Sequence, residues 1–176
     1  MALAFEFLGW PDEGPTLRLD YRRFAYAGKF VMSSTGKAVA REGGEVVAAL
    51  AFNADRTDAS TCWLRYVTVR EDRRGEGIGP RLIAFALSEI DERFDRVKIA
   101  VNNPFAYEAL YKGGFGFTGE ETGIAELVLS RPAPEGRSAD RYRDGLDRFR
   151  ERDLSDAEER FLAERDGWSP PPVEED

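Results

Sequence analysis

The segment over residues 61–94 constrains the fold more than any other part of the chain. Residues 61–70 are rich in Trp, Tyr, Val and Thr and are predicted to form a β-strand. Apolar residues from Leu82 to Ile90 recur at helical spacing, so a helix is expected through about Phe94. Glycines at 75, 77 and 79 lie between the two. A strand that turns through glycines into a helix indicates a mixed α/β fold.

The glycine loop has the composition of an anion site. Glycines let successive backbone N–H groups turn toward one anion without a Cβ clash, and a helix N-terminus adds unpaired donors and partial positive charge. Pro80 fits the first turn because its missing N–H needs no partner there. Arg73 or Arg74 would supply a formal countercharge. The segment therefore predicts a diphosphate cradle.

A loop of this kind has three other interpretations. The dinucleotide fingerprint Gly-x-Gly-x-x-Gly fails because its third glycine falls on Pro80 or Leu82. The phosphate loop Gly-x-x-x-x-Gly-Lys-Ser/Thr is absent from the sequence. A glycine-rich turn that binds no ligand stays open on these residues alone.

The other elements follow from hydrophobic periodicity and turn residues. Gly43 and Gly44 join two apolar runs as a hairpin, and Pro104 after Asn103 opens a helix through Lys112. Asp20 is expected to cap a short helix over 21–31, with a strand over 16–20 as the alternative. The further strands are predicted over 5–9, 37–41, 46–52, 96–101 and 124–129.

Two motifs resemble the GNAT superfamily of N-acetyltransferases. Arg74-Gly75-Glu76-Gly77-Ile78-Gly79 matches the signature Arg/Gln-x-x-Gly-x-Gly/Ala. Asn103, Ala106 and Gly114-Phe115 have the spacing of the second signature. The resemblance covers about residues 36–131 and extends back to residue 3. It implies an α/β (α+β) fold with a mixed, mostly antiparallel central sheet flanked by helices, over a domain of residues 1–131.

The resemblance also assigns a cosubstrate site. In that family the loop binds the pyrophosphate of acetyl-CoA, and the preceding strand splays from its neighbour and pairs its backbone with the pantetheine arm. The implied cofactor-binding residues are Val67, Thr68, Val69, Arg74, Gly75, Glu76, Gly77, Ile78, Gly79 and Asn103. No metal ligands are implied.

The catalytic groups depart from the family pattern. The family's tyrosine, which protonates the departing CoA thiolate, falls on Leu110 here, and tyrosines occupy 107 and 111. Tyr111 is the first candidate and Tyr107 the second, with a packing role for both as the alternative. The strand carries no carboxylate before Glu71, where many members place a glutamate. No general base is assigned, and catalysis by proximity and backbone amides is the remaining expectation.

The resemblance implies acetyl transfer from acetyl-CoA to a primary amine of a small molecule or a protein. The alternative is a non-catalytic acyl-CoA-binding module with a regulatory or scaffold role. The missing family tyrosine and glutamate favour that alternative to some degree. The residues do not identify the acceptor.

Composition excludes several other classes of function. The 176 residues carry a net charge of −8, which disfavours nucleic-acid binding, and no apolar run is long enough to cross a membrane. The absence of histidine excludes His-based zinc sites and imidazole bases. The single Cys62 and the lack of a signal-like start fit a reducing cytoplasm. Arginines number 21 and lysines 4, which fits a salt-adapted microbe or a GC-rich genome equally.

The composition shifts at Pro132, and residues 132–176 are expected to form an acidic, Arg-rich helical extension. Tyr142, Leu146 and Phe149 share one helical face, and Ser155 begins a capping box before a second helix that includes Phe161 and Leu162. These apolar stripes need burial, either in a homodimer, which is slightly favoured, or over a sheet edge of the same chain. The segment from Pro170 on is expected to fray.

Overall fold

The computed structural model describes residues 2–133 and 136–174, and the chain divides into two compact units, Met1–Val97 and Lys98–Asp176. Each unit combines strands with helices, and the strands pair antiparallel in both, so the predicted mixed α/β fold is confirmed. Among the described residues, no helix has both the length and the apolar character of a membrane span.

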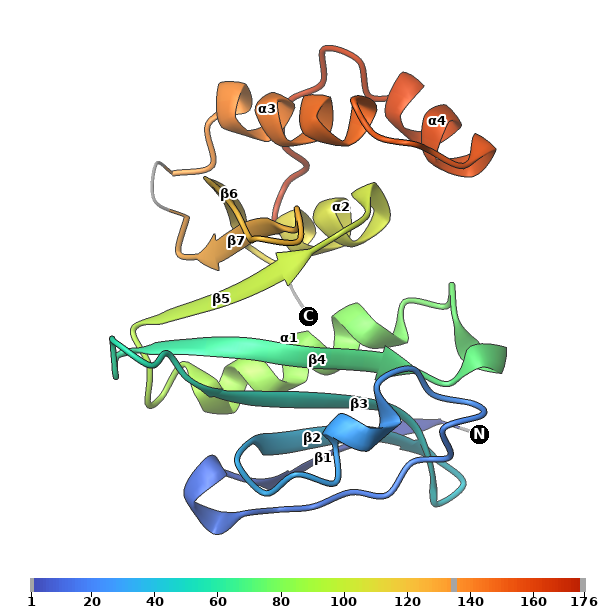
Figure 1. Ribbon diagram of the computed structural model, residues 1–176, viewed down its shortest axis with the longest axis vertical. Coiled ribbons are helices and arrows are strands. Elements are labelled where there is room, and N and C mark those ends of the chain that lie inside the picture. Colours follow the sequence, from blue (N-terminus) through green and yellow to red (C-terminus); the bar gives the residue numbers. More distant parts are fainter. Residues whose placement is uncertain (1, 134–135, 175–176) are drawn as a thin grey trace. The chain divides into compact units, whose positions relative to one another are not determined.

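The first unit contains four antiparallel strands in the order β1-β2-β3-β4 and one long helix (Figure 1). The strands β1, β2, β3 and β4 span Leu3–Gly9, Gly36–Glu42, Glu45–Ala54 and Thr61–Val69, and α1 spans Ile78–Ile90. Three short 3-10 helices, η1, η2 and η3, span Pro11–Glu13, Ala27–Lys29 and Glu71–Arg73. The strand β5, Arg96–Val101, begins at the end of this unit.

The predicted hairpin is confirmed, because Glu42 pairs with Glu45 across a two-residue turn. Both turn residues, Gly43 and Gly44, have positive φ, at 61° and 84°, as a type I′ turn requires. Between β3 and β4 the register shifts where Ala51 pairs with Tyr66 and Phe52 pairs with Leu64. Arg65 is the extra residue of this bulge, so β4 bends just before its last four residues.

The two faces of these strands are covered differently. The helix α1 packs on β1–β4 through an apolar stripe that includes Leu82, Ala86 and Ile90, all fully buried. The opposite face carries a cluster of Phe30, Val39, Ala49 and Ala51, covered by the segment between β1 and β2. That segment has no α-helix: residues 21–31 form turns and η2, and residues 16–20 are not a strand, so both alternatives predicted there are wrong.

A buried lysine fixes the covering segment. Lys37 is fully buried, and its Nζ donates to the carbonyl oxygens of Pro15, Met32 and Thr35 at 2.6, 2.7 and 3.1 Å, and to Thr35 Oγ1 at 2.9 Å. Burial lowers the pKa of this ammonium. The four oxygen atoms tie both ends of the irregular segment to β2, which replaces the hydrogen bonding that a helix would have supplied.

The second unit orders its strands as β5-β7-β6, and its described residues include three helices. The helix α2 spans Pro104–Lys112, as predicted, with β6 at Gly116–Glu121 and β7 at Leu127–Arg131. The predicted last strand over 124–129 is shifted, because residues 122–125 form the turn into β7, Ala125 has a φ of 64°, and Ile124 is exposed.

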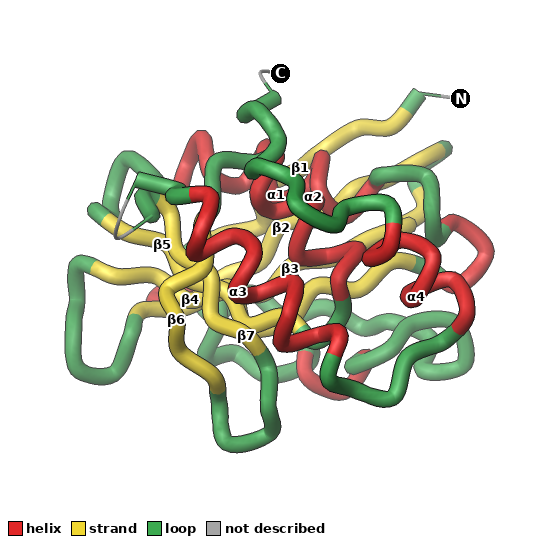
Figure 2. The backbone as a smooth tube through the Cα atoms, turned by 90° about the horizontal axis from the view of Figure 1, so that it is seen from above, coloured by secondary structure: helices red, strands yellow, loops and turns green. Residues whose placement is uncertain are grey.

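The two helices predicted in the C-terminal segment are confirmed. They are α3, Ala139–Arg150, and α4, Asp156–Ala163, and Ser155 and Glu158 form the capping box. Figure 2 shows α3 over β6 and β7. The stripe of Tyr142, Leu146 and Phe149 is buried within the unit, where Tyr142 and Phe149 contact Tyr107.

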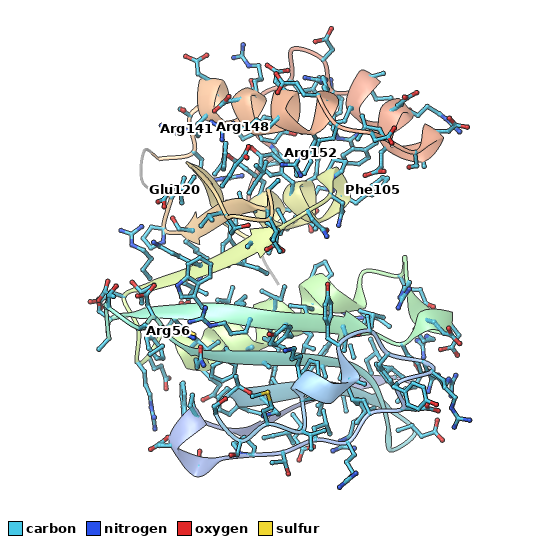
Figure 3. All side chains as sticks on the ribbon, in the orientation of Figure 1. Arg56, Phe105, Glu120, Arg141, Arg148 and Arg152 are labelled. Carbon is cyan, nitrogen blue, oxygen red and sulfur yellow. The ribbon has the colours of Figure 1, made fainter. Side chains whose placement is uncertain are left out.

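Arginines of α3 cap the outer strand β6. Arg141 donates to the carbonyl oxygen of Thr118 at 3.2 Å, and Arg148 donates to that of Gly119 at 3.3 Å and to Glu121 at 3.2 Å. Figure 3 shows these arginines, with Arg152, on the side of α3 that faces β6. The extension therefore covers a sheet edge of its own chain.

Because the α3 stripe is already buried, it needs no second subunit, which removes the reason for favouring a homodimer. The oligomeric state and the division at residue 131 stay predictions. The fraying predicted from Pro170 on does not hold for two described residues, since Pro171 accepts a hydrogen bond from Arg137 and Glu174 donates one to Lys112. Residues 175 and 176 lie outside the described residues.

Candidate functional site

One continuous stretch of the first unit brings most of the predicted cofactor-binding residues together. The strand β4 ends at Val69, η3 follows, and the loop of residues 74–77 enters α1 at Ile78. Val67, Thr68 and Val69 are thus separated from the glycines by a single short connection. Asn103, the remaining predicted residue, belongs to the second unit.

The loop glycines adopt backbone conformations that other residues avoid. Gly75 and Gly77 have φ of 81° and 78°, and Gly77 is the N-cap of α1. A Cβ added at either glycine would meet no atom within 4 Å. Glycine is therefore needed here for its backbone conformation, and its lack of a side chain leaves open space beside the loop.

Gly79 lies against β4, where an added Cβ would make ordinary van der Waals contacts. A Cβ at Gly79 would lie 3.5 Å from Val69 Cγ2 and 4.0 Å from Val67 Cγ1. The helix thus begins directly against β4, and Val67 and Val69 point toward it.

The first turn of α1 offers unpaired donors. Among the described residues, no hydrogen bond is donated by the backbone N–H groups of Gly75, Gly77, Ile78 or Gly79, and no side chain caps the helix. The N–H groups of a helix start carry partial positive charge and seek an acceptor from outside the helix. A cluster of such donors beside open space suits a diphosphate group.

The two candidate countercharges have different roles. Arg73 donates to both Glu42 oxygens at 2.8 and 3.1 Å and to both Glu76 oxygens at 3.2 Å, and these carboxylates raise its pKa. Its charge is fully engaged by these two carboxylates, which leaves the three side chains with one net negative charge. Arg74 donates only to the carbonyl oxygen of Val69 at 3.3 Å and has no carboxylate partner among the described residues. Of the two arginines, Arg74 is therefore the one whose charge is not engaged by a carboxylate among the described residues.

Thr68 and Tyr66 lie on the face of β4 opposite α1, because side chains alternate along a strand. Thr68 pairs with Ala49 and is 4% exposed, yet its Oγ1 has no hydrogen-bond partner among the described residues. Tyr66 is half-buried, and its ring packs against that of Tyr26, with the two ring centroids 5.6 Å apart.

Tyr26 is a feature that the sequence analysis missed. It is exposed, and it holds a left-handed φ of 61°, which is strained for a tyrosine. Lys29 lies nearby, with Nζ 5.7 Å from the centre of the Tyr66 ring and no carboxylate partner among the described residues. Positive φ at a non-glycine residue has no signature in the sequence.

The comparison with protein families decides the assignment. Residues 2–117 match the family model described as the acetyltransferase (GNAT) family, which is about two-thirds of the chain. The chain belongs to the GNAT acetyltransferase family. A search of curated proteins gives no match.

Solved GNAT structures share the fold. A GNAT family acetyltransferase from Elizabethkingia anophelis, solved with acetyl-CoA bound, aligns with a TM-score of 0.54 and 14% identity over 73% of this chain and 96% of that one. YncA from Salmonella typhimurium, a putative acetyltransferase solved with its cofactor acetyl-CoA, aligns with a TM-score of 0.50 and 16% identity over 55% of this chain and 63% of that one. The chain spans 64% of the length of nourseothricin acetyltransferase, with 20% identity and a TM-score of 0.48, and 64% of the length of an N-acetyltransferase from Staphylococcus aureus Mu50.

The candidate catalytic tyrosines of this GNAT chain lie in the core of the second unit. Tyr107 and Tyr111 are both fully buried, with ring centroids 5.0 Å apart. The Tyr107 hydroxyl donates to the carbonyl oxygen of Tyr142, and the Tyr111 hydroxyl accepts from the backbone N–H of Phe117, both at 2.9 Å. Burial raises the pKa of both phenols. These contacts support the packing role, and the catalytic role stays a prediction.

Asn103 is the N-cap of α2. Its Oδ1 accepts a hydrogen bond from the backbone N–H of Ala106 at 2.8 Å, which satisfies one donor at the helix start. This contact gives Asn103 a structural role as a helix cap. Cofactor binding by Asn103 stays a prediction.

Proposed function

We propose that this chain transfers an acetyl group from acetyl-CoA to a primary amine. The observation that carries the proposal is the first turn of α1, where unpaired N–H groups and the Arg74 guanidinium lie beside open space. This set of donors suits a diphosphate, and the acetyl-CoA in the Elizabethkingia and Salmonella structures supports its identity.

The residues of the first unit divide the binding work. The N–H groups of residues 75–79 and Arg74 would hold the diphosphate, and the backbone of Val67–Val69 would hold the pantetheine arm. Acetyl-CoA supplies a thioester, whose carbonyl carbon is attacked by a neutral amine. Arg73, through Glu42 and Glu76, fixes the loop so that its N–H groups are arranged before the ligand binds.

The proposal is tested by ligand-induced stabilisation. CoA and acetyl-CoA should each raise the melting temperature, because a ligand that binds only the folded chain stabilises it by mass action. Gly77→Val should abolish this shift by straining the loop and filling the space beside it. Gly167→Val is the matched control, since Gly167 also has a positive φ of 74° and no atom within 4 Å of an added Cβ.

Both variants should lose similar stability, about 1–2 kcal/mol, from the left-handed backbone. Only Gly77→Val should lose the response to CoA. An equal response to CoA in both variants, or no heat of CoA binding to the wild-type chain, would overturn the assignment.

The chemistry is tested by thiol release from acetyl-CoA with a panel of phenethylamine, spermidine, L-lysine, kanamycin and a peptide with a free N-terminus. Cys62 does not interfere with a thiol reagent, because it is fully buried and burial raises its pKa to about 12. Release above the amine-free rate is expected with at least one amine.

The burial of Tyr107 and Tyr111 favours a second candidate, an acyl-CoA-binding module without catalysis. CoA binding without thiol release across the panel would support this second function. A cytoplasmic location stays part of the proposal, supported by the single buried thiol, which fits a reducing compartment.

A further inference from the structure

The hydroxyl of Thr68 is a polar group without a partner in the interior of the first unit. Thr68 is 4% exposed, and its Oγ1 makes no hydrogen bond among the described residues. Other threonine hydroxyls of the chain are paired: Thr61 donates to Asp58, and Thr118 donates to the carbonyl oxygen of Val128. An unpaired buried hydroxyl is unfavourable, so this exception calls for an acceptor or a water at Thr68.

The position of Thr68 gives this hydroxyl a functional setting. Thr68 lies between Val67 and Val69, on the stretch of β4 proposed to hold the pantetheine arm. Its side chain lies on the face away from α1, opposite the small residue Ala49, and Tyr66 precedes it on the same face. The alanine leaves the hydroxyl without a bulky neighbour across the strand pair.

The acetyl transfer needs a route for one proton. The amine nitrogen loses a proton as the C–N bond forms, and the sulfur gains one as the C–S bond breaks. The transfer therefore needs no net acid or base, only a path from nitrogen to sulfur. A hydroxyl suits such a path because it donates and accepts hydrogen bonds at once.

Other groups of the chain are poorly suited to this task. The chain has no histidine, and β4 has no carboxylate. Two nearby carboxylates of the first unit are engaged with arginines: Asp72 pairs with Arg70 and Arg23, and Glu42 pairs with Arg73. Glu71 follows the strand and is exposed to solvent, whereas Thr68 is buried within it. The hydroxyls of Tyr107 and Tyr111 are committed within the core of the second unit.

We propose that Thr68 Oγ1 positions a water molecule that receives the proton from the attacking amine and passes it to the departing sulfur. Thr68 is a positioning residue in this scheme, since it holds the water and does not change its own charge. The inference rests on the proposed acetyl transfer and assigns to Thr68 the work that a strand glutamate would otherwise do.

Three variants test the role of Thr68. Thr68→Val replaces the hydroxyl with a methyl group of similar shape, and Thr68→Ser keeps the hydroxyl. Thr61→Val is the matched control: it makes the same change on the same strand, but the lost hydroxyl is paired with Asp58 at 2.8 Å.

The stability and the turnover of these variants should move in opposite directions. Thr68→Val should melt at or above the wild-type temperature, because it removes an unpaired buried hydroxyl, while its turnover should fall at least about tenfold. Thr61→Val should melt at a lower temperature and keep its turnover. Thr68→Ser should restore most of the turnover, and CoA affinity by calorimetry should be unchanged in all three.

Two further readouts separate positioning from packing. A high-resolution crystal structure should show a water within hydrogen-bond distance of Oγ1 in the wild type and not in Thr68→Val. The ratio of turnover in H2O and D2O should differ between these two proteins, because the proton path is altered.

Active wild-type protein with an equally active Thr68→Val would overturn this inference and leave the acetyl transfer intact. A high-resolution crystal structure without an ordered water within hydrogen-bond distance of Thr68 Oγ1 would also overturn it. Wild-type protein that binds CoA but releases no thiol with any amine would refute the proposed function, and this inference with it.

Discussion

Removing the Tyr111 hydroxyl separates a packing role from a catalytic one. The hydroxyl accepts a hydrogen bond from the backbone N–H of Phe117 at 2.9 Å, and both residues are buried. In Tyr111→Phe this N–H has no acceptor, which costs about 1–3 kcal/mol. For a chain of this size that lowers the melting temperature by roughly 2–12 °C.

The matched variant is Tyr107→Phe. The Tyr107 hydroxyl donates to the carbonyl oxygen of Tyr142 at 2.9 Å. Its loss removes one donor from this carbonyl oxygen but leaves no N–H group unpaired. The expected cost is about 0.5–1.5 kcal/mol, because a carbonyl with two lone pairs tolerates the loss of one donor better. Tyr111→Phe should therefore be the less stable variant.

The assay combines thermal melting by circular dichroism, CoA binding by calorimetry, and thiol release at 25 °C, where both variants are folded. If the two hydroxyls only stabilise the core through their hydrogen bonds, turnover per folded molecule and CoA affinity stay at the wild-type values. A Tyr111→Phe protein of wild-type stability with turnover reduced more than about tenfold would refute the packing argument and establish Tyr111 as the acid.

Three more perturbations test other parts of the structure. Arg74→Gln should weaken CoA binding about tenfold, measured by calorimetry, and reduce its salt dependence. Arg73→Gln should mainly lower the melting temperature and change the CoA affinity less, because Glu42 and Glu76 lose their partner. Hydrogen bonds from Thr57 and Trp63 lower the pKa of Asp55 to about 2, below its unfolded value. The contribution of ionised Asp55 to the free energy of unfolding is therefore complete above about pH 4 and is lost as the pH falls toward 2. Asp55→Asn should remove this part of the acid unfolding curve measured by circular dichroism. Deleting residues 133–176 uncovers Tyr107 and Tyr111. Hydrogen exchange should then show that the backbone amides of the remaining second unit are unprotected. Full protection of these amides would show instead that the second unit folds without the extension.

The sequence was sufficient where a local pattern determines the local structure. Gly43 and Gly44 predicted the hairpin, and Asn103 with Pro104 predicted the start of α2, because turns and caps depend on a few adjacent residues. The glycine loop was predicted for the same reason. The absence of a side chain permits the positive φ of Gly75 and Gly77, although Gly79 does not adopt one.

The sequence was not sufficient to predict a residue's role or conformation where these depend on a contact with a residue far away in the chain. Arg73 and Arg74 are indistinguishable in sequence, and they differ because Glu42, from another strand, lies within reach of Arg73. Residues 21–31 have helical spacing, but the buried Phe30 and the Lys37 hydrogen bonds hold the segment in turns. The α3 stripe gave no indication of its partner, which proved to be the tyrosine cluster of the same chain.

The enclosure of Lys37 has a consequence for self-modification. The proposed acetyl transfer to amines would make the chain's own lysines candidate acceptors, and there are four, Lys29, Lys37, Lys98 and Lys112. The Lys37 amine is sealed by four oxygen acceptors and is fully buried, so acetyl groups reach it only when the segment over residues 15–35 opens. Acetylation there would remove the charge that holds the segment closed, and an opened chain so marked could not close again.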